Sequence, residues 1–235
     1  MEAALVNAKT HGLKVLGILD SWMFDKGWIF TLEEWRGNVT QHVSQFSDYV
    51  DAWEIWNEPA HPNFTLSSDK YYAMVETASP IIRQYDPTAK IVLFGGLSLW
   101  SGNDPNLDLD KNFLKQLGAT NIEQYGDAFS VHAYSCLGRV ESWVWEKYSD
   151  ALAFYRGFFP SLEVWVTETG HYVDVDGEQG QAHYLSDAVR YFSEENVTRL
   201  FWYSLFDNDW EDHQFGLVQE GTPRLVYNEL KDVLT

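Results

Sequence analysis

The 235-residue sequence contains a single cysteine, Cys136, so an intrachain disulfide bond is excluded. Cys136 stands in an unremarkable context between Ser135 and Leu137, and we interpret it as a small, half-buried side chain rather than a nucleophile. No apolar run approaches the roughly 18 residues of a membrane-spanning helix. The N-terminus also lacks the basic region and long apolar stretch of a signal peptide. We therefore expect a cytoplasmic protein by default, or else a fragment of a secreted enzyme.

Basic residues are few, with 16 Lys and Arg against 35 Asp and Glu, and the formal net charge is −19 at pH 7. Such a surface repels phosphate backbones and anionic lipids, so nucleic acid and membrane surfaces are not expected as partners. A neutral substrate is not repelled in this way. A glycine-rich phosphate-binding turn is also missing, because Gly95-Gly96 alone is too short to form one.

Metal-ligand spacing is absent as well. A metal hydrolase would have to draw on three histidines and two acids without any His-x-x-x-His or comparable spacing: His132, His171, His213, Asp207 and Asp209. The segment 174–178 resembles a calcium loop only superficially, because its glycine is at the fourth position and not the sixth. We interpret it as a solvated acidic turn. Acid–base chemistry alone needs no cofactor, and we expect none.

What is present is a regular alternation of apolar strands and amphipathic helices, which is typical of parallel β/α architecture. At 45% hydrophobic residues the chain can bury one sizeable core, and we predict a single domain over residues 1–235. The predicted strands are 14–20, 53–59, 90–97, 128–134, 162–168 and 199–206. The predicted helices are 1–11, 32–50, 68–85, 110–118, 144–157 and 179–195, with a last one from residue 227.

The distribution of polar and aromatic residues favours a (β/α) TIM-type barrel over an open doubly wound sheet. These residues follow almost every predicted strand, whereas a doubly wound sheet gathers them at one crevice. Catalytic residues of barrels lie at the C-terminal ends of the strands. The chain supplies about six β/α units, so the predicted barrel is incomplete.

Two predicted strands end in an isolated glutamate. Glu58 lies in Asn57-Glu58-Pro59, where the proline cannot continue a central strand, and Glu168 lies in Thr167-Glu168-Thr169. Two carboxylates delivered from separate strands are what glycoside hydrolysis requires. The alternative is that both are carboxylates of ordinary surface loops.

The neighbours of the two glutamates favour the catalytic interpretation. Asn57 could bond a substrate hydroxyl beside the reacting carbon, and His132 and Tyr134 share one face of their strand, where the phenol could hold a nucleophilic carboxylate. Either residue of that strand could instead belong to the core. Four tryptophans on or after strands could stack on sugar faces, although packing is the alternative for each: Trp22, Trp100, Trp202 and Trp210.

Several segments resemble, in order and spacing, the retaining (β/α)8 glycosidases of glycoside hydrolase clan A, which include families 5 and 39. Trp53-Glu-Ile-Trp-Asn-Glu-Pro59 is similar to their strand-four signature, and Val164-Trp-Val-Thr-Glu-Thr-Gly170 to their strand-seven nucleophile motif. His132-Ala-Tyr134 resembles the strand-six motif and Phe201-Trp-Tyr203 the strand-eight one. Residues 215–218 and 221–227 resemble the run into the final helix. The similarity covers essentially the whole chain.

The resemblance implies a retaining hydrolase of β-linked O-glycosides, with Glu58 as acid/base and Glu168 as nucleophile in a double displacement. The carboxyl groups of such a pair are about 5–5.5 Å apart. Glu54 has the same strand parity as Glu58 but lies four residues deeper, roughly 13 Å by strand rise, in the barrel interior. We therefore expect Glu54 to be a buried polar residue and not the catalyst.

The resemblance fails at the start of the chain. The strand at 14–20 corresponds to strand three of the family, so strands one and two have no counterpart, nor has the arginine that ends strand two. Asp20 and Trp22 stand where many relatives place a histidine or another polar group. The chain could be a truncated fragment, a smaller six-stranded barrel, or a partial barrel whose open edges are covered by self-association as a homo-oligomer, which we favour. The alternative function is a catalytically weak or inactive carbohydrate-binding protein.

Overall fold

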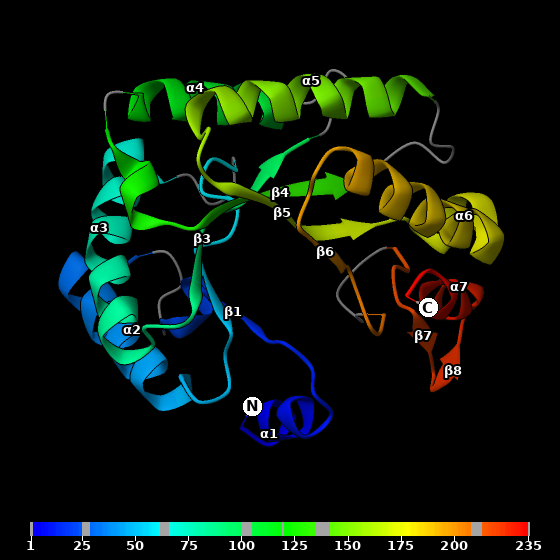
Figure 1. Cartoon of the computed structure of the whole chain (residues 1–235), viewed down its shortest axis with the longest axis horizontal. Helices are drawn as coiled ribbons and strands as arrows, with labels where there is room; N and C mark the ends of the chain where they lie inside the picture. Colours follow the sequence, from blue (N-terminus) through cyan, green and yellow to red (C-terminus); the bar gives the residue numbers. More distant parts are fainter. Residues whose placement is uncertain are drawn as a thin grey trace. The chain divides into compact units, whose positions relative to one another are not determined.

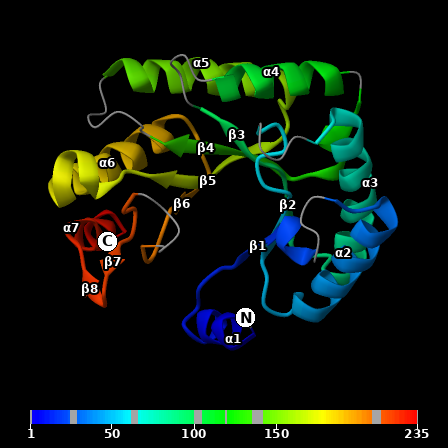
Figure 2. The same ribbon diagram turned by 180° about the vertical axis from the view of Figure 1, so that it is seen from behind.

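The computed structural model describes residues 2–24, 29–61, 66–99, 105–118, 120–134, 142–207 and 213–234. Six strands form one sheet in the order β1-β2-β3-β4-β5-β6 (Figure 1; β2 is labelled in Figure 2). The order follows the chain without the reversal that defines a doubly wound sheet, so the predicted barrel-type fold with six β/α units is confirmed. The strands are β1 (Leu16–Leu19), β2 (Ala52–Ile55), β3 (Lys90–Ser98), β4 (Ala128–Tyr134), β5 (Glu163–Gly170) and β6 (Arg199–Trp202).

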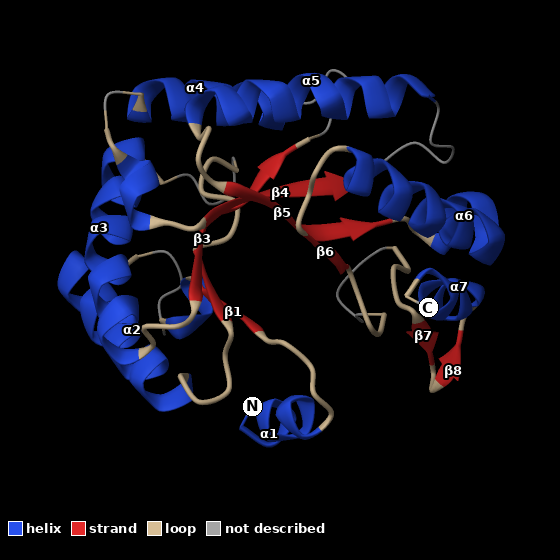
Figure 3. Cartoon of the chain, in the orientation of Figure 1, coloured by secondary structure: helices blue, strands red, loops and turns tan. Residues whose placement is uncertain are grey.

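Helices separate consecutive strands, as expected for parallel β/α units (Figure 3). A short antiparallel pair, β7 (Val218–Gln219) and β8 (Thr222–Pro223), precedes the last helix. No helix within the described ranges has both the length and the apolar character needed to cross a membrane. The helices are α1 (Glu2–Thr10), α2 (Leu32–Phe46), α3 (Ser68–Tyr85), α4 (Pro105–Leu117), α5 (Ser142–Phe158), α6 (Val173–Glu194) and α7 (Leu225–Val233), with 3-10 turns η1 (Ser21–Met23) and η2 (Ile122–Tyr125).

Helix α6 is longer than predicted, because it begins at Val173 and not near residue 179. Its two segments meet at a kink where Gly177 has a φ of +68°, a conformation that glycine adopts without steric cost. The acidic segment 174–178 therefore forms the first turns of a helix and not an isolated turn.

The chain packs as two compact units. The first unit comprises residues 1–97, 108–130 and 158–163, and the second comprises residues 98–107, 131–157 and 164–235. Glu58 belongs to the first unit, and Glu168 belongs to the second.

In the first unit, α2 and α3 lie side by side (Figure 1 and Figure 2). Helix α2 begins with a capping box in which Thr31 and Glu34 bond each other's backbone N–H, and its fully buried Trp35, Val39 and Val43 recur at helical spacing. Trp35 also donates its indole N–H to the carbonyl of Met74 on α3, at 2.9 Å. The periodic buried side chains of α2 and the hydrogen-bonded indole of Trp35 therefore hold α2 against α3.

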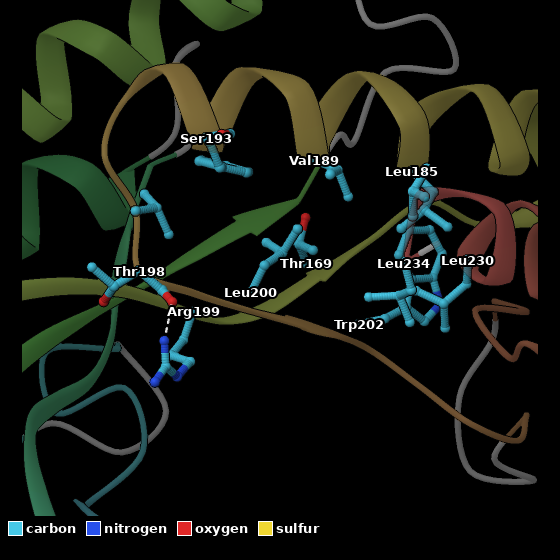
Figure 4. A pocket seen from close by; sticks show the side chains of 13 residues that line it. Thr169, Leu185, Val189, Ser193, Thr198, Arg199, Leu200, Trp202, Leu230 and Leu234 are labelled. Atoms are coloured by element: carbon cyan, nitrogen blue, oxygen red, sulfur yellow. Dashed lines mark hydrogen bonds between the residues drawn. The ribbon is translucent and has the colours of Figure 1, made fainter. Parts of the chain in front are cut away.

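In the second unit, α6 and α7 pack together around a cluster formed by Ala182, Leu185, Leu217 and Val226. A pocket of about 330 Å³ lies between these helices and β6, with Leu185, Leu230 and Leu234 among the side chains that line it (Figure 4). Strands β4 and β5 are tied to α6 because Thr169 Oγ1 and Tyr184 Oη both lie within hydrogen-bond distance of the Ala133 carbonyl.

Candidate active site

Glu58 follows the end of β2 in a turn with an unusual backbone. Trp56 has a φ of +71° and Glu58 a φ of +45°, values in the left-handed region that side-chain-bearing residues seldom adopt. Neighbouring strands hold this turn, since the Trp56 N–H donates to the Leu19 carbonyl at 2.9 Å and the Glu58 N–H donates to the Gly95 carbonyl at 2.7 Å. The backbone at the predicted acid is therefore constrained from both sides, as strained functional turns require.

Gly95 makes room for this turn. It has a φ of +50°, and a Cβ at this position would lie 1.9 Å from the carbonyl oxygen of Trp56. The neighbouring Phe94 also has a positive φ, of +78°. The glycine pair 95–96, which carries no phosphate-loop signature, thus serves the close approach of β3 to the turn that carries Glu58.

The side chains of this turn differ in how far they are buried. Trp56 is 1% exposed and packs against Trp35 and Phe30, with ring centroids 6.1 and 5.4 Å away. Asn57 and Glu58 remain half-buried. The Asn57 Oδ1 atom is shielded from solvent and has no hydrogen-bond partner among the described residues, so it is an acceptor that a ligand hydroxyl could satisfy. Glu54 is 1% exposed within β2, which confirms the prediction that it is buried.

The end of β1 carries Asp20 and Trp22. Asp20 caps η1 by accepting a hydrogen bond of 2.9 Å from the Trp22 backbone N–H. Burial raises the pKa of the Asp20 carboxyl above its ordinary value, and this hydrogen bond offsets the rise only in part. The Trp22 side chain is 91% exposed, so its ring is accessible for stacking.

In the second unit, Glu168 on β5 is held by side chains of β4. Tyr134 donates its phenolic O–H to Glu168 Oε2 at 2.5 Å, and His132 Nδ1 lies 3.5 Å from the same oxygen. His132 and Tyr134 are two residues apart and so project from one face of the strand. The Glu168 side chain is 23% exposed and that of His132 is 4% exposed. The arrangement presents a partly accessible carboxylate in a fixed orientation.

With this geometry in place, the comparisons with known proteins decide the family. The family model of the cellulases, glycosyl hydrolase family 5, matches residues 20–208. The chain belongs to glycosyl hydrolase family 5. The predicted resemblance to clan A glycosidases is therefore confirmed. No curated protein matches the sequence.

Solved structures agree with the family 5 assignment at the level of the fold. A family 39 glycoside hydrolase from the gut symbiont Bacteroides cellulosilyticus WH2 is 20% identical with a TM-score of 0.68, covering 95% of this chain and 50% of that one. The family 1 β-glucosidase from Thermotoga maritima is 16% identical with a TM-score of 0.70, covering 99% of this chain and 76% of that one. The family 5 chain thus spans only half the length of the family 39 hydrolase.

Of the predicted sugar-stacking tryptophans, Trp100 and Trp210 lie outside the described residues. Trp202 packs against α6 and α7 beside Leu185 and Leu230 (Figure 4). It also donates its indole N–H to the Phe215 carbonyl at 3.1 Å. In this family 5 protein the Trp202 indole therefore packs against α6 and α7, and its N–H already has an acceptor.

The sequence did not reveal the aromatic side chains that surround Tyr134. The rings of Tyr203 and Phe215 lie edge to face against Tyr134, with centroids 6.1 and 5.7 Å away. Tyr203 follows Trp202 directly, and strand alternation could have pointed to it. Phe215 stands in the resembling run before the final helix, and that motif alone does not indicate what its ring contacts.

The residues considered for a metal site make pairwise contacts instead. His171 Nε2 lies 3.5 Å from Asp176 Oδ2, and His213 Nδ1 lies 3.4 Å from Asp174 Oδ2. Asp207 pairs with Arg224. Within the part of the chain that the structure describes, no three His, Cys, Asp or Glu side chains are arranged to hold a metal ion.

Proposed function

We propose that this family 5 chain is a retaining glycoside hydrolase that cleaves β-linked O-glycosides by double displacement, with Glu168 as nucleophile and Glu58 as acid/base. The observation that carries the proposal is the hydrogen bond of 2.5 Å from Tyr134 to Glu168 Oε2. A nucleophilic carboxylate must be held in one orientation toward the anomeric carbon, and a charge-assisted hydrogen bond does this. Glu58 supports the second role because it follows β2, another strand of the same parallel sheet.

In the first step, a carboxylate oxygen of Glu168 forms a bond to the anomeric carbon while the bond from that carbon to the leaving oxygen breaks. The carboxylic acid of Glu58 gives its proton to the leaving oxygen. In the second step, the Glu58 carboxylate takes a proton from water as the water oxygen bonds to the anomeric carbon. The bond between the anomeric carbon and the Glu168 oxygen breaks as the bond to water forms, and the Glu168 carboxylate is regenerated.

Other side chains are proposed to bind the sugar. The buried Asn57 Oδ1 would accept a hydrogen bond from a hydroxyl next to the anomeric carbon. Trp22, at 91% exposure, would stack on an apolar sugar face. His132, whose Nδ1 lies 3.5 Å from Glu168 Oε2, would also bind the sugar. A neutral carbohydrate suits a protein with a net charge of −19, because its approach carries no electrostatic penalty.

We also propose that two chains associate along their open sheet edges. Apolar side chains are exposed at the β1 end of the sheet, where Ile18 on the strand is 44% and Leu13 before it 60% exposed. After β6, Leu205 and Phe206 are also 52% and 56% exposed, although their backbone pairs with Val218. An unpaired strand edge with exposed apolar side chains, such as the outer edge of β1 in the described sheet, favours pairing with another chain. Light scattering after size exclusion would show a dimer, and a monomer at all accessible concentrations would contradict self-association.

Hydrolysis of 4-nitrophenyl β-glycosides of several sugars tests the mechanism. Glu168→Gln should reduce turnover by at least about 10³-fold, because removing a catalytic nucleophile leaves only residual binding effects. Glu194→Gln is the matched control, since Glu194 is exposed on α6 of the same unit. A 2-deoxy-2-fluoro glycoside of the sugar that is hydrolysed should label Glu168, as read by mass spectrometry of peptides.

Hydrolysis that Glu168→Gln leaves unchanged, or a label on another residue, would contradict the proposed mechanism. A second candidate function is carbohydrate binding with weak or no turnover. It is favoured by the Trp22 ring, which is 91% exposed and could stack on a sugar without any catalysis. Calorimetric binding of oligosaccharides without any hydrolysis would support this candidate and exclude the first.

A further inference from the structure

Phe215 stands at the centre of a group of tyrosines next to Glu168. Its ring meets Tyr134 at a centroid distance of 5.7 Å and an angle of 70°, and Tyr203 at 5.7 Å and 73°. It meets Tyr172 at 5.3 Å and 87°. Edge-to-face contacts of this kind are favourable beyond the area they bury, and they fix the relative orientation of the rings.

Gly170 brings this ring close to β5. A Cβ at position 170 would lie 2.5 Å from the Tyr203 carbonyl oxygen and 3.0 Å from Phe215 Cδ1. A side chain there would push the Phe215 ring away. Because Gly170 follows Glu168 by two residues, the ring is seated on the strand that carries the nucleophile.

The backbone around Phe215 is fixed by an ion pair. Asp207 accepts hydrogen bonds from Arg224 at 2.7 and 2.9 Å, and it also accepts the Gly216 N–H at 2.8 Å. Arg224 donates to the Gly216 carbonyl at 2.7 Å. The Phe215 carbonyl accepts from Gln181 Nε2 at 3.2 Å. These hydrogen bonds fix the backbone that carries the Phe215 ring beside Tyr134.

We propose that Phe215 is a positioning residue that holds the Tyr134 phenol against Glu168. It acts through Tyr134, whose ring it contacts, and Tyr134 carries the hydrogen bond to Glu168 Oε2. The consequence for catalysis rests on the proposed function, in which the direction of the Glu168 carboxylate determines the rate. Small displacements of a reacting group can lower a rate about 10²-fold.

The direct test is a crystal structure of the Phe215→Leu variant of the full chain. We expect the distance from Tyr134 Oη to Glu168 Oε2 to lengthen beyond hydrogen-bond range, because the side chain that supports the phenol has lost its ring. The matched control is Phe113→Leu, which makes the same change at a residue of α4 that is 6% exposed and lies in the other unit. The control should keep the hydrogen bond at 2.5 Å.

A kinetic cycle separates positioning from general packing. Phe215→Leu should lower kcat about tenfold with little change in KM, and Phe215→Tyr, which keeps the ring, should recover most of the loss. In a Tyr134→Phe background, Phe215→Leu should lower kcat by less than about twofold, because the hydrogen bond that Phe215 supports is already absent. Equal losses in both backgrounds would overturn the positioning role.

The two tests distinguish this inference from the proposed function. If the wild-type chain neither hydrolyses glycosides nor accepts a label on Glu168, the proposed function fails. The crystal structure still decides the positioning: loss of the Tyr134–Glu168 bond in Phe215→Leu supports it, and an unchanged bond refutes it. Thermal unfolding of each variant confirms that the compared proteins are folded.

Discussion

Tyr134 Oη lies 2.5 Å from Glu168 Oε2, and the two residues come from adjacent strands, β4 and β5. A hydrogen bond to a charged group contributes about 1.5–3 kcal/mol, and each 1.36 kcal/mol corresponds to a tenfold rate difference. This contact therefore carries enough free energy to matter for a catalytic carboxylate.

The first prediction is that Tyr134→Phe lowers kcat/KM by roughly 10- to 100-fold while the protein remains folded at the assay temperature. The phenol ring keeps its packing against Phe215, and only the hydrogen bond to the carboxylate is removed. Steady-state hydrolysis of an aryl β-glycoside measures the loss. Tyr125→Phe, which removes a phenol that bonds Glu76 in the first unit, is the control and should leave the rate unchanged. Equal rates for Tyr134→Phe and wild type would show that the bond has no catalytic role.

The second prediction concerns Glu58 and the leaving group. Glu58→Ala should reduce hydrolysis of alkyl β-glycosides by at least about 10²-fold, because general acid catalysis contributes roughly that factor or more. Formation of the glycosyl-enzyme from 2,4-dinitrophenyl glycosides should be far less affected, since that leaving group departs without a proton. Pre-steady-state release of dinitrophenol reports this step alone.

Glu33→Gln is the control for this second variant, because Glu33 is exposed on α2 of the same unit. A small nucleophile offers a further check: azide should accelerate turnover of Glu58→Ala, since it attacks the ester without general-base help. If Glu58→Ala slows both classes of substrate equally, Glu58 is not the acid.

The third prediction is that Gly95→Ala destabilises the fold by more than about 2 kcal/mol. The residue has a φ of +50°, and the added Cβ would collide with the Trp56 carbonyl oxygen. Strained backbone at one residue costs about 1–3 kcal/mol before the collision is counted. Urea unfolding measures the change in free energy.

Gly37→Ala is a matched control with the opposite expected sign. Gly37 lies inside α2, and a Cβ added there would meet no other atom within 4 Å, so alanine should stabilise the helix by about 0.5–1 kcal/mol. If Gly95→Ala also stabilised the protein, the turn before Glu58 would not depend on the close approach of β3.

Sequence reasoning singled out Glu58 and Glu168 as candidates because each acid comes at or just after an apolar segment, a pattern carried by neighbours in the chain. In the structure β2 ends at Ile55, before Glu58, and β5 continues to Gly170, past Glu168. Tyr134 was predicted to hold a carboxylate because it lies two residues after His132, on the same face of the strand. The role of Gly95 could not be predicted, since it depends on the carbonyl of Trp56, which is distant in sequence. Phe215 was missed for the same reason. Its three tyrosine contacts come from separate segments, and no local pattern encodes their meeting.

The orientation of Trp202 shows a related limit. Parity on β6 leaves two faces available, and the sequence does not say which one packs against helices. In the structure Trp202 lies on the side of Leu185 and Leu230, with its indole N–H on the Phe215 carbonyl. Side-chain direction on a short edge strand depends on tertiary packing, whereas the existence of the strand depends on local apolar composition.

The last prediction concerns the pH dependence of stability at Asp207. Burial raises the pKa of its carboxyl, but the hydrogen bonds from Arg224 and Gly216 and the charge of Arg224 outweigh this effect and lower the pKa below 3.8. Because the folded-state pKa is depressed, the stabilisation is fully present above the unfolded-state value and is lost as the pH falls through the folded-state value.

Asp207→Asn should therefore cost about 3–5 kcal/mol at pH 7, because it leaves the Arg224 side chain, only 2% exposed, without its counter-charge. The cost should shrink below about pH 4, because there the carboxyl of the unfolded wild-type chain binds a proton before the folded one does. Urea unfolding at pH 7, 5 and 3 measures this trend. Asp187→Asn, which breaks an exposed pair with Arg190, should cost less than about 1 kcal/mol at pH 7. A cost for Asp207→Asn that is constant from pH 7 to pH 3 would mean that the charge of Asp207 does not hold the segment around Phe215.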